Sequence, residues 1–330
     1  MRSWGRVPTG AAPHPLPGAW PISQPERSVA ARGADGKGDT WADWSTSRDT
    51  RLFVDERGDA TGFPVLVLHG GPGLDHTMFA DYLDPLTSDG RRRLVMVDQR
   101  ACGRSDRSAD LSTWTLERMA EDIQGLTAEL GLGRDYVVLG HSFGAMAVLQ
   151  HAVDHPGELR GTIVSAGMAD ATWLAEVDAN LASFEPLELR EQVTASWARE
   201  KEVRTNEEME QLMRDQMPFH FRDPRGAALI DYLRRTEGRA QYSPDVVRRF
   251  AAEEYGGIAV RDRLKQVTHP VLVLAGRHDR TCVSGASEEM TELLPHAELV
   301  VFEESAHMFF AEEQYRFLKA VTAFLDRVTG

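Results

Sequence analysis

Apolar segments of strand length alternate with segments of helical periodicity along much of the chain. Apolar residues recur at helical spacing in 116–130 and 144–153, for example, while strands are predicted at residues 50–58, 63–71, 92–100, 135–142, 159–167, 269–276 and 297–305. Most of these strands are continuous apolar runs, which is typical of strands buried on both faces. Strands that alternate with helices predict an α/β fold, in which helices flank a mostly parallel sheet.

The alternation stops between residues 168 and 262, where the chain is rich in Glu, Arg, Met and Trp and shows several amphipathic helical patterns but no buried strand. We therefore predict an α/β core formed by residues 41–167 and 263–330, interrupted by a helical cap at 168–262. Residues 1–40 are rich in Pro, Gly and Ala and hold too little apolar surface to offset the entropic cost of ordering. They are predicted to be a mostly disordered extension.

Composition narrows the classes of partner. The net charge is −14, which argues against nucleic acid because such binders need a basic surface. No apolar run reaches membrane-spanning length and no apolar leader is apparent, so we expect no membrane partner and a cytoplasmic location. The two cysteines, Cys102 and Cys282, fit a reduced pair, and no Cys/His cluster has metal-ligand spacing.

The strongest local motif is Gly140-His141-Ser142-Phe143-Gly144, a G-x-S-x-G between a predicted strand and a predicted helix. In that context the serine lies on a tight turn that projects its hydroxyl above the sheet, and the flanking glycines avoid clashes. The N-terminus of the following helix favours negative charge that develops beside the serine. Ser142 is therefore the predicted nucleophile.

A serine hydroxyl needs a base, and His307 is the predicted one. It follows the last predicted strand and precedes the last helix, which places it at the carboxyl edge of the sheet, where open α/β sheets bind ligands. His296 precedes its strand and should lie at the opposite edge. His278 remains a weaker alternative beside the predicted acid.

The acid is expected between the serine and the histidine in chain order. Asp279 follows the predicted strand 269–276 and meets this requirement. Asp245 and Asp262 are less suitable because both fall in the predicted cap. Beside the imidazole, Asp279 would fix one tautomer and stabilise the imidazolium.

Two backbone N–H groups are predicted to form an oxyanion hole. One belongs to Phe143, directly after the nucleophile, and the other to Gly71 in the glycine-rich segment 69–73 (HGGPG). With Ser142 and His307 they would support acyl transfer through an acyl-enzyme. This chemistry requires no metal and no organic cofactor.

Three segments, HGGPG at 69–73, DQRACGRSD at 98–106 and GHSFGA at 140–145, together resemble the prolyl aminopeptidase (proline iminopeptidase) family of α/β-hydrolases. The resemblance extends over roughly residues 50–330. It implies a serine hydrolase of the α/β-hydrolase fold that removes an N-terminal aminoacyl residue from a small peptide or aminoacyl amide. It assigns the triad to Ser142, Asp279 and His307.

The resemblance also implies carboxylates in the cap that bind the free α-amino group. Glu200 and Glu202 lie near the expected place, and Glu207, Glu208 and Glu210 compete with them. Charged residues on a cap are usually a solvated face, so the sequence does not choose among these glutamates.

Aromatic residues of the cap are candidates for an apolar acyl pocket, namely Trp173, Trp197 and Phe219. The family often has glycine at the position of Ala101 and a GGSWG elbow, so the resemblance alone does not establish strict proline specificity. Other small or apolar acyl residues, and small-metabolite amides, stay open. We expect Arg100 or Arg104 to order its loop through an ion pair rather than to contact substrate.

Two other functions compete with this interpretation. A carboxylesterase or lactonase would use the same triad on an ester, since this fold supports many chemistries. A binding protein without turnover is disfavoured because the sequence keeps all three triad residues in the expected order.

Overall fold

An eight-stranded sheet forms the centre of the molecule, in the order β1-β2-β4-β3-β5-β6-β7-β8. The strands from β4 to β8 in this order run parallel, and β1 and β2 pair antiparallel at one edge. Their bounds are β1 Thr40–Asp43, β2 Arg51–Gly58, β3 Phe63–Leu68, β4 Arg92–Val97, β5 Val137–His141, β6 Gly161–Ser165, β7 Val271–Gly276 and β8 Ala297–Phe302. The predicted α/β fold with a mostly parallel sheet is confirmed, and β1 is an additional edge strand.

The computed structural model describes residues 40–43, 50–107 and 110–330, the first four by their backbone alone. The predicted extension, residues 1–40, lies outside the described residues except for Thr40. In the described part of the chain, no helix combines the length and the apolar character that crossing a membrane requires.

The strand order changes direction at β3, which lies between β4 and β5. The chain passes from β3 to β4 on one side and then returns to pair β5 on the other side of β3. The carboxyl ends of β3 and β5 therefore lie next to each other at a topological switch point, where α/β sheets bind ligands. The glycine-rich segment 69–73 follows β3, and Ser142 follows β5.

Helices cover the sheet because the central strands are apolar throughout. The strands β3, β5 and β7 are almost completely buried, so each needs a layer on both faces. Helices α1 (Leu116–Glu129) and α2 (Phe143–Asp154) pack against each other, and α8 (Ser284–Leu293) packs on β7 and β8. The chain ends with the short α9 (Phe309–Glu312) and with α10 (Gln314–Thr329).

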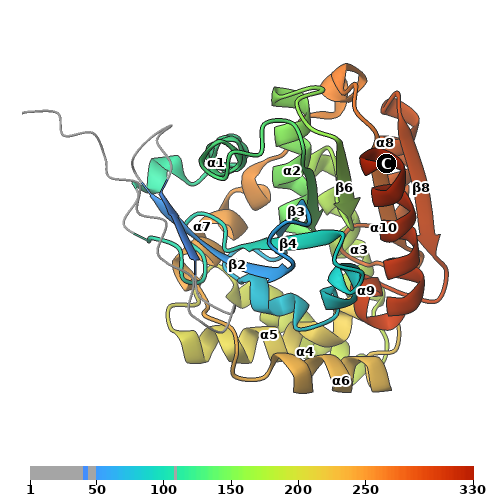
Figure 1. The fold of residues 1–330 in the computed structure, drawn as a ribbon. Helices are drawn as coiled ribbons and strands as arrows, with labels where there is room; N and C mark the ends of the chain where they lie inside the picture. Colours follow the sequence, from blue (N-terminus) through green and yellow to red (C-terminus); the bar gives the residue numbers. More distant parts are fainter. Residues whose placement is uncertain (1–39, 44–49, 108–109) are drawn as a thin grey trace, which may run out of the picture.

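Between β6 and β7, residues 166–270 contribute no strand to the sheet, and all of them are described. This helical insertion contains α3 Ala175–Ser183, α4 Leu187–Arg199, α5 Asn206–His220, α6 Ala227–Thr236 and α7 Pro244–Ala252. Figure 1 shows α4, α5 and α6 as a layer along one side of the molecule. The insertion has an apolar cluster of its own, formed by Val177, Leu181, Phe184, Val193 and Phe219. The range predicted as a cap, 168–262, lies within it.

Candidate active site

Ser142 lies at a sharp turn between β5 and α2. Its φ of 56° and ψ of −118° are unfavourable for a residue with a side chain, and such backbone strain is characteristic of functional sites. The Ser142 N–H donates to the carbonyl of Ser165 on the neighbouring strand (2.9 Å), which fixes the turn. A Cβ at Gly140 would collide with the Gly144 carbonyl, and one at Gly144 would collide with the end of β3. The glycines of the motif therefore allow the turn to pack tightly.

His307 and Asp279 form a buried pair on the loops that follow β8 and β7. The Nδ1 atom of His307 lies 2.7 Å from Oδ2 of Asp279, and only 3 % of the His307 surface is exposed. With Nδ1–H donating to the carboxylate, the Nε2 atom carries the lone pair that a general base needs. The structure thus brings together the acid and the base that were predicted from chain order.

The other oxygen of Asp279 is held by the residues that directly follow it. Its Oδ1 atom accepts hydrogen bonds from the Thr281 N–H (2.8 Å), the Thr281 hydroxyl (2.9 Å) and the Cys282 N–H (3.0 Å). Burial alone would raise the pKa of the Asp279 carboxyl, but His307 and these donors outweigh it and hold the pKa below its ordinary value. Asp279 is therefore ionised at neutral pH.

Ser142 and His307 line one cavity of about 100 Å³. Among the described residues, no hydrogen bond joins the two side chains in this state of the molecule; such bonds often tighten only when substrate binds. Gly71 and Phe143 line the same cavity, and their N–H groups donate to no acceptor within the described chain. Two unpaired N–H groups beside a nucleophile provide the donors that an oxyanion requires.

Two further histidines surround the ring of His307. The His141 ring centroid lies 4.9 Å away and that of His220 5.2 Å away. Burial, with a contribution from His307, lowers the pKa of both, to about 3 for His220 and well below the ordinary value for His141. Both rings are therefore neutral at pH 7, and neither adds a positive charge beside the base.

The backbone of His220 connects the helical insertion to the loop that carries His307. Its carbonyl oxygen accepts from the N–H of His307 (3.0 Å) and from that of Met308 (3.3 Å). His220 is the last residue of α5 and lines the cavity with His307. The end of an insertion helix therefore holds the loop that carries the predicted base.

Glu200 brings a buried carboxylate to the wall of this cavity. It is 7 % exposed; one of its oxygens accepts from the Gln216 side-chain amide (2.7 Å), and the other accepts from the Tyr255 hydroxyl. Burial raises the pKa of Glu200, and these two donors and Lys201 oppose the shift. Among the described residues no cation forms an ion pair with it, so the cavity offers a carboxylate without a counter-ion.

Of the other residues predicted to bind substrate, some line the cavity and others do not. Trp197 lines the cavity, whereas Glu202 is exposed and does not reach it. Trp173 and Phe219 are also absent from the cavity wall. Trp173 donates to Glu289 through Nε1 (2.9 Å), and Phe219 is buried in the apolar cluster of the insertion. His278, the alternative base, is exposed.

The segment 98–106 makes hydrogen bonds to the loop that follows β3. Gln99 donates to the carbonyl of His69 (2.8 Å), and Asp98 accepts from the N–H groups of His76 and Arg104 (2.9 Å each). These bonds join the loop after β4 to the glycine-rich loop that carries Gly71. The segment 98–106 therefore helps to fix the loop whose Gly71 N–H belongs to the predicted oxyanion hole.

The expected ion pair is present in the same loop. The Nε atom of Arg100 donates to Asp122 of α1 (2.8 Å), and the guanidinium is buried. Arg100 does not line the cavity. The predicted ion pair that orders this loop is confirmed for Arg100.

Three residues of the site were missed from the sequence. Thr281 follows the acid by two positions, a pattern in which a hydroxyl bonds a nearby carboxylate, so its role was accessible. His220 and Tyr255 carried no such signal, because they reach the cavity only through the packing of the insertion. No group of three or more His, Cys, Asp or Glu side chains in the described residues is arranged to hold a metal ion.

Comparisons with known proteins identify the family of the chain. The model of the alpha/beta hydrolase fold family matches residues 64–314. The chain is 28 % identical over 287 residues to a proline iminopeptidase of Heyndrickxia coagulans, covering 83 % of this chain and 93 % of that protein. It is 27 % identical over 287 residues to a proline iminopeptidase of Saccharolobus solfataricus, covering 80 % and 85 %. These relatives confirm the resemblance predicted from the three motif segments.

Solved structures give the same fold. An α/β-fold hydrolase from Bacillus anthracis str. Sterne superposes with a TM-score of 0.73 at 23 % identity, covering 88 % of this chain and 99 % of that one. Proline iminopeptidase from Mycobacterium smegmatis superposes with a TM-score of 0.67 at 24 % identity, covering 88 % and 98 %.

Proposed function

Because the chain belongs to the alpha/beta hydrolase fold family, we propose that it is a serine hydrolase that removes an N-terminal aminoacyl residue from an amide. The observation that carries the proposal is Glu200, an unpaired buried carboxylate in the wall of the cavity that also holds Ser142 and His307. A carboxylate in this position is the group that a protonated α-amine would pair with. The relatives named proline iminopeptidase support the same proposed function.

The proposed mechanism uses Ser142, His307 and Asp279 in the predicted roles. His307 Nε2 takes the hydroxyl proton of Ser142 as its oxygen attacks the acyl carbon, while the N–H groups of Gly71 and Phe143 stabilise the oxyanion. The imidazolium then gives this proton to the leaving amine as the C–N bond breaks. Water hydrolyses the acyl-enzyme with His307 as its base, which releases the amino acid and restores the serine.

Glu200 is proposed to orient the substrate through its α-amine. Burial of a charge without a partner is costly, so a cationic amine that enters the cavity would favour the ionised carboxylate. The hydroxyl of Tyr255 and the amide of Gln216 hold the two carboxylate oxygens in place. The amine of the substrate then fixes the distance between its acyl carbon and Ser142.

The cavity restricts the size of the acyl group. Its volume is about 100 Å³, and apolar side chains make up much of its wall, including Met168, Leu174, Val177 and Trp197. Such a space suits proline or another small apolar residue better than a long or charged one.

The first experiment compares wild type with Ser142→Ala on aminoacyl anilides that carry a free or an acetylated α-amine, and on nitrophenyl esters. We expect anilide cleavage that needs the free amine and disappears with Ser142→Ala. Cleavage of esters alone, or equal cleavage of acetylated anilides, would instead support a carboxylesterase or lactonase. Slow ester turnover beside amine-dependent anilide cleavage does not count against the proposal, because nitrophenyl esters are activated.

The second experiment tests the carboxylate. Glu200→Gln removes the charge and keeps the shape of the side chain, and we expect kcat/KM for the free-amine substrate to fall roughly 10²-fold, as when a buried charge pair is truncated. Glu191→Gln, on the exposed face of the same helix α4, is the matched control. Equal activity of the two variants would rule out Glu200 as the amine site.

A further inference from the structure

A second pocket adjoins the cavity of Ser142 and is the larger of the two. Its volume is about 330 Å³, against about 100 Å³ for the inner cavity. Helices α5 and α6, the following loop to Tyr242 and the loop after the glycine-rich segment line it. Five apolar or aromatic residues line both spaces, namely Leu74, Met78, Met213, Met217 and Tyr232. A continuous apolar wall therefore extends from the nucleophile into the outer pocket.

The two spaces differ in their remaining lining. Glu200, Tyr255, His220 and the triad residues Ser142 and His307 line the inner cavity only. If the α-amine binds Glu200, the acyl residue fills the inner cavity. The outer pocket is then left for the atoms on the far side of the bond that is cleaved.

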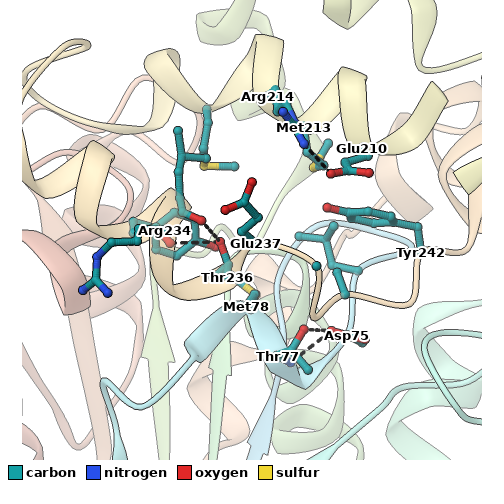
Figure 2. Close-up of a pocket in the computed structure, with 16 residues that line it drawn as sticks. Asp75, Thr77, Met78, Glu210, Met213, Arg214, Arg234, Thr236, Glu237 and Tyr242 are labelled. Carbon is teal, nitrogen blue, oxygen red and sulfur yellow. Dashed lines mark hydrogen bonds and ion pairs between the residues drawn. The ribbon is translucent and has the colours of Figure 1, made fainter. Parts of the chain in front are cut away.

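Among the described residues that line the outer pocket, no cation is free to meet an incoming carboxylate. Arg214 is paired with Glu210 of the same helix (2.5 Å), and Arg234 is paired with Asp231 (2.7 Å). In Figure 2, Arg234 extends away from the other labelled side chains. Both arginines among the lining residues are therefore already neutralised.

Glu210 is paired with Arg214, whereas the other two acidic lining residues, Asp75 and Glu237, form no ion pair among the described residues. Glu237 follows the end of α6, and Figure 2 shows its carboxylate reaching toward the α5 side chains. Its charge contributes, after that of Glu210, to raising the pKa of Arg214, yet within the described residues it forms no ion pair or side-chain hydrogen bond. Asp75 is held by the backbone N–H groups of Thr77 (3.0 Å) and Gln241 (2.7 Å).

We propose that the outer pocket is the leaving-group subsite of the enzyme, and that it selects a bulky apolar amine without a carboxylate. The inference rests on the proposed function, and it names the half of the substrate that the triad and Glu200 do not specify. The amine that receives the proton of His307 leaves through this pocket, as a neutral molecule or with a positive charge. A free amino acid as leaving group would bring its carboxylate toward Glu237 with no free cation to meet it.

The experiment uses three substrates that share one acyl residue: the alanyl primary amide, alanyl-phenylalanine amide and alanyl-phenylalanine. The first releases ammonia and does not fill the outer pocket, the second releases a bulky amine without a carboxylate, and the third releases the same group with one. We expect wild type to prefer the second over the third by roughly tenfold in kcat/KM, the effect of one partly screened charge contact. Added salt should reduce this preference.

Three variants test the pocket directly. Glu237→Lys should reverse or abolish the preference for the phenylalanine amide over phenylalanine, mainly through KM, while Glu237→Gln should give an intermediate ratio. Ala240→Trp fills the outer pocket from a loop position and should lower kcat/KM for both bulky substrates relative to the primary amide. Glu191→Gln, outside both spaces, should keep the wild-type ratios.

The outcomes separate this inference from the proposed function. If wild type cleaves none of the three amides, whether their shared acyl residue is alanine or proline, the proposed function fails and the leaving-group assignment fails with it. If the primary amide is cleaved but the two bulky substrates react equally in wild type and in Glu237→Lys, the function stands and the assignment of the outer pocket is overturned.

Discussion

At the scale of single residues, Thr281 is the side chain that contacts both the acid and the base. Its hydroxyl lies 2.9 Å from Oδ1 of Asp279 and 2.9 Å from Nδ1 of His307. Because His307 Nδ1–H already donates to Oδ2 of Asp279, the threonine hydroxyl donates to Oδ1 and locks the plane of the carboxylate. Thr281 is therefore a positioning residue for the imidazole.

We expect Thr281→Val to lower kcat roughly tenfold, since one hydroxyl hydrogen bond to a charged group is lost while two backbone donors remain. Asp279→Asn should cost far more, on the order of 10⁴, because it disturbs the imidazole tautomer. Because Thr281→Val removes a hydrogen-bond donor to Asp279, it should also shift the acidic limb of the plot of kcat against pH. Restored activity in Thr281→Ser, with an unchanged melting temperature in all three variants, would separate positioning from a loss of structure.

Site residues could be predicted from the sequence where the adjacent strand or helix in the chain determines their position. Ser142 lies between a strand and a helix of its own chain segment, and Asp279 and His307 each directly follow a strand, so parallel pairing brings them to one edge. Glu200 and Glu202 were not distinguishable. They lie two residues apart at the end of α4, and only the packing of Gln216 and Tyr255 against that end selects Glu200.

At the scale of elements, the end of β7 supports the loop that carries His307. A Cβ added to Gly276 would overlap the carbonyl of Ala306, the residue before His307. The strand that ends with Gly276 also leads directly to Asp279. The close approach of the Ala306 carbonyl to Gly276 therefore sets the distance between the loop that carries Asp279 and the loop that carries His307.

Gly276→Ala should push the 303–308 loop away from β7 and weaken the contact between His307 and Asp279. Overpacking of this kind costs roughly 1–3 kcal/mol of unfolding free energy, and we expect a loss of kcat in addition. Gly133→Ala is the comparison: its φ of 56° makes alanine strained, but the space around it is open and lies outside the site. Urea denaturation and kcat of both variants check this, and a normal kcat in Gly276→Ala would contradict it.

The order of the elements was more predictable than their packing. Seven strands were located from the sequence, most of them from continuous apolar runs, whereas β1 was not, because Thr40–Asp43 is short and has no continuous apolar run. The helical nature of the insertion was also predictable, from its amphipathic patterns. Which helix faces supply the cavity depends on contacts between α4, α5 and the segment around Tyr255, which no local pattern encodes.

At the scale of the whole molecule, several buried histidines make the fold sensitive to acid. Burial lowers the pKa of His151 and His220 to about 3 and that of His269 to about 4. The pKa of a histidine in the unfolded chain is about 6.5. Between pH 6.5 and about 4 the unfolded chain therefore binds more protons than the folded one, so the unfolding free energy falls as the pH falls through this range.

We expect His269 alone to contribute about 2 kcal/mol of this loss between pH 8 and pH 5. Its Nδ1 accepts from the Gly157 N–H (3.1 Å) and its Nε2 faces the Thr162 hydroxyl (2.9 Å), so protonation removes an acceptor. Urea denaturation at several pH values measures the slope for wild type and for His269→Gln, whose amide does not titrate. Parallel slopes for the two proteins would show that His269 plays no part.

The bond from the His220 carbonyl to the backbone of the catalytic loop makes the insertion and the base a single mechanical unit. If the insertion swings outward, the N–H groups of His307 and Met308 lose their common acceptor, and the imidazole loses its backbone anchor at the same moment. An open molecule would then be inactive, and a substrate could enter and leave it without being hydrolysed. If the proposed hydrolysis needs this anchor, it would take place only in the closed form, and the rate of closing would then set an upper limit on turnover.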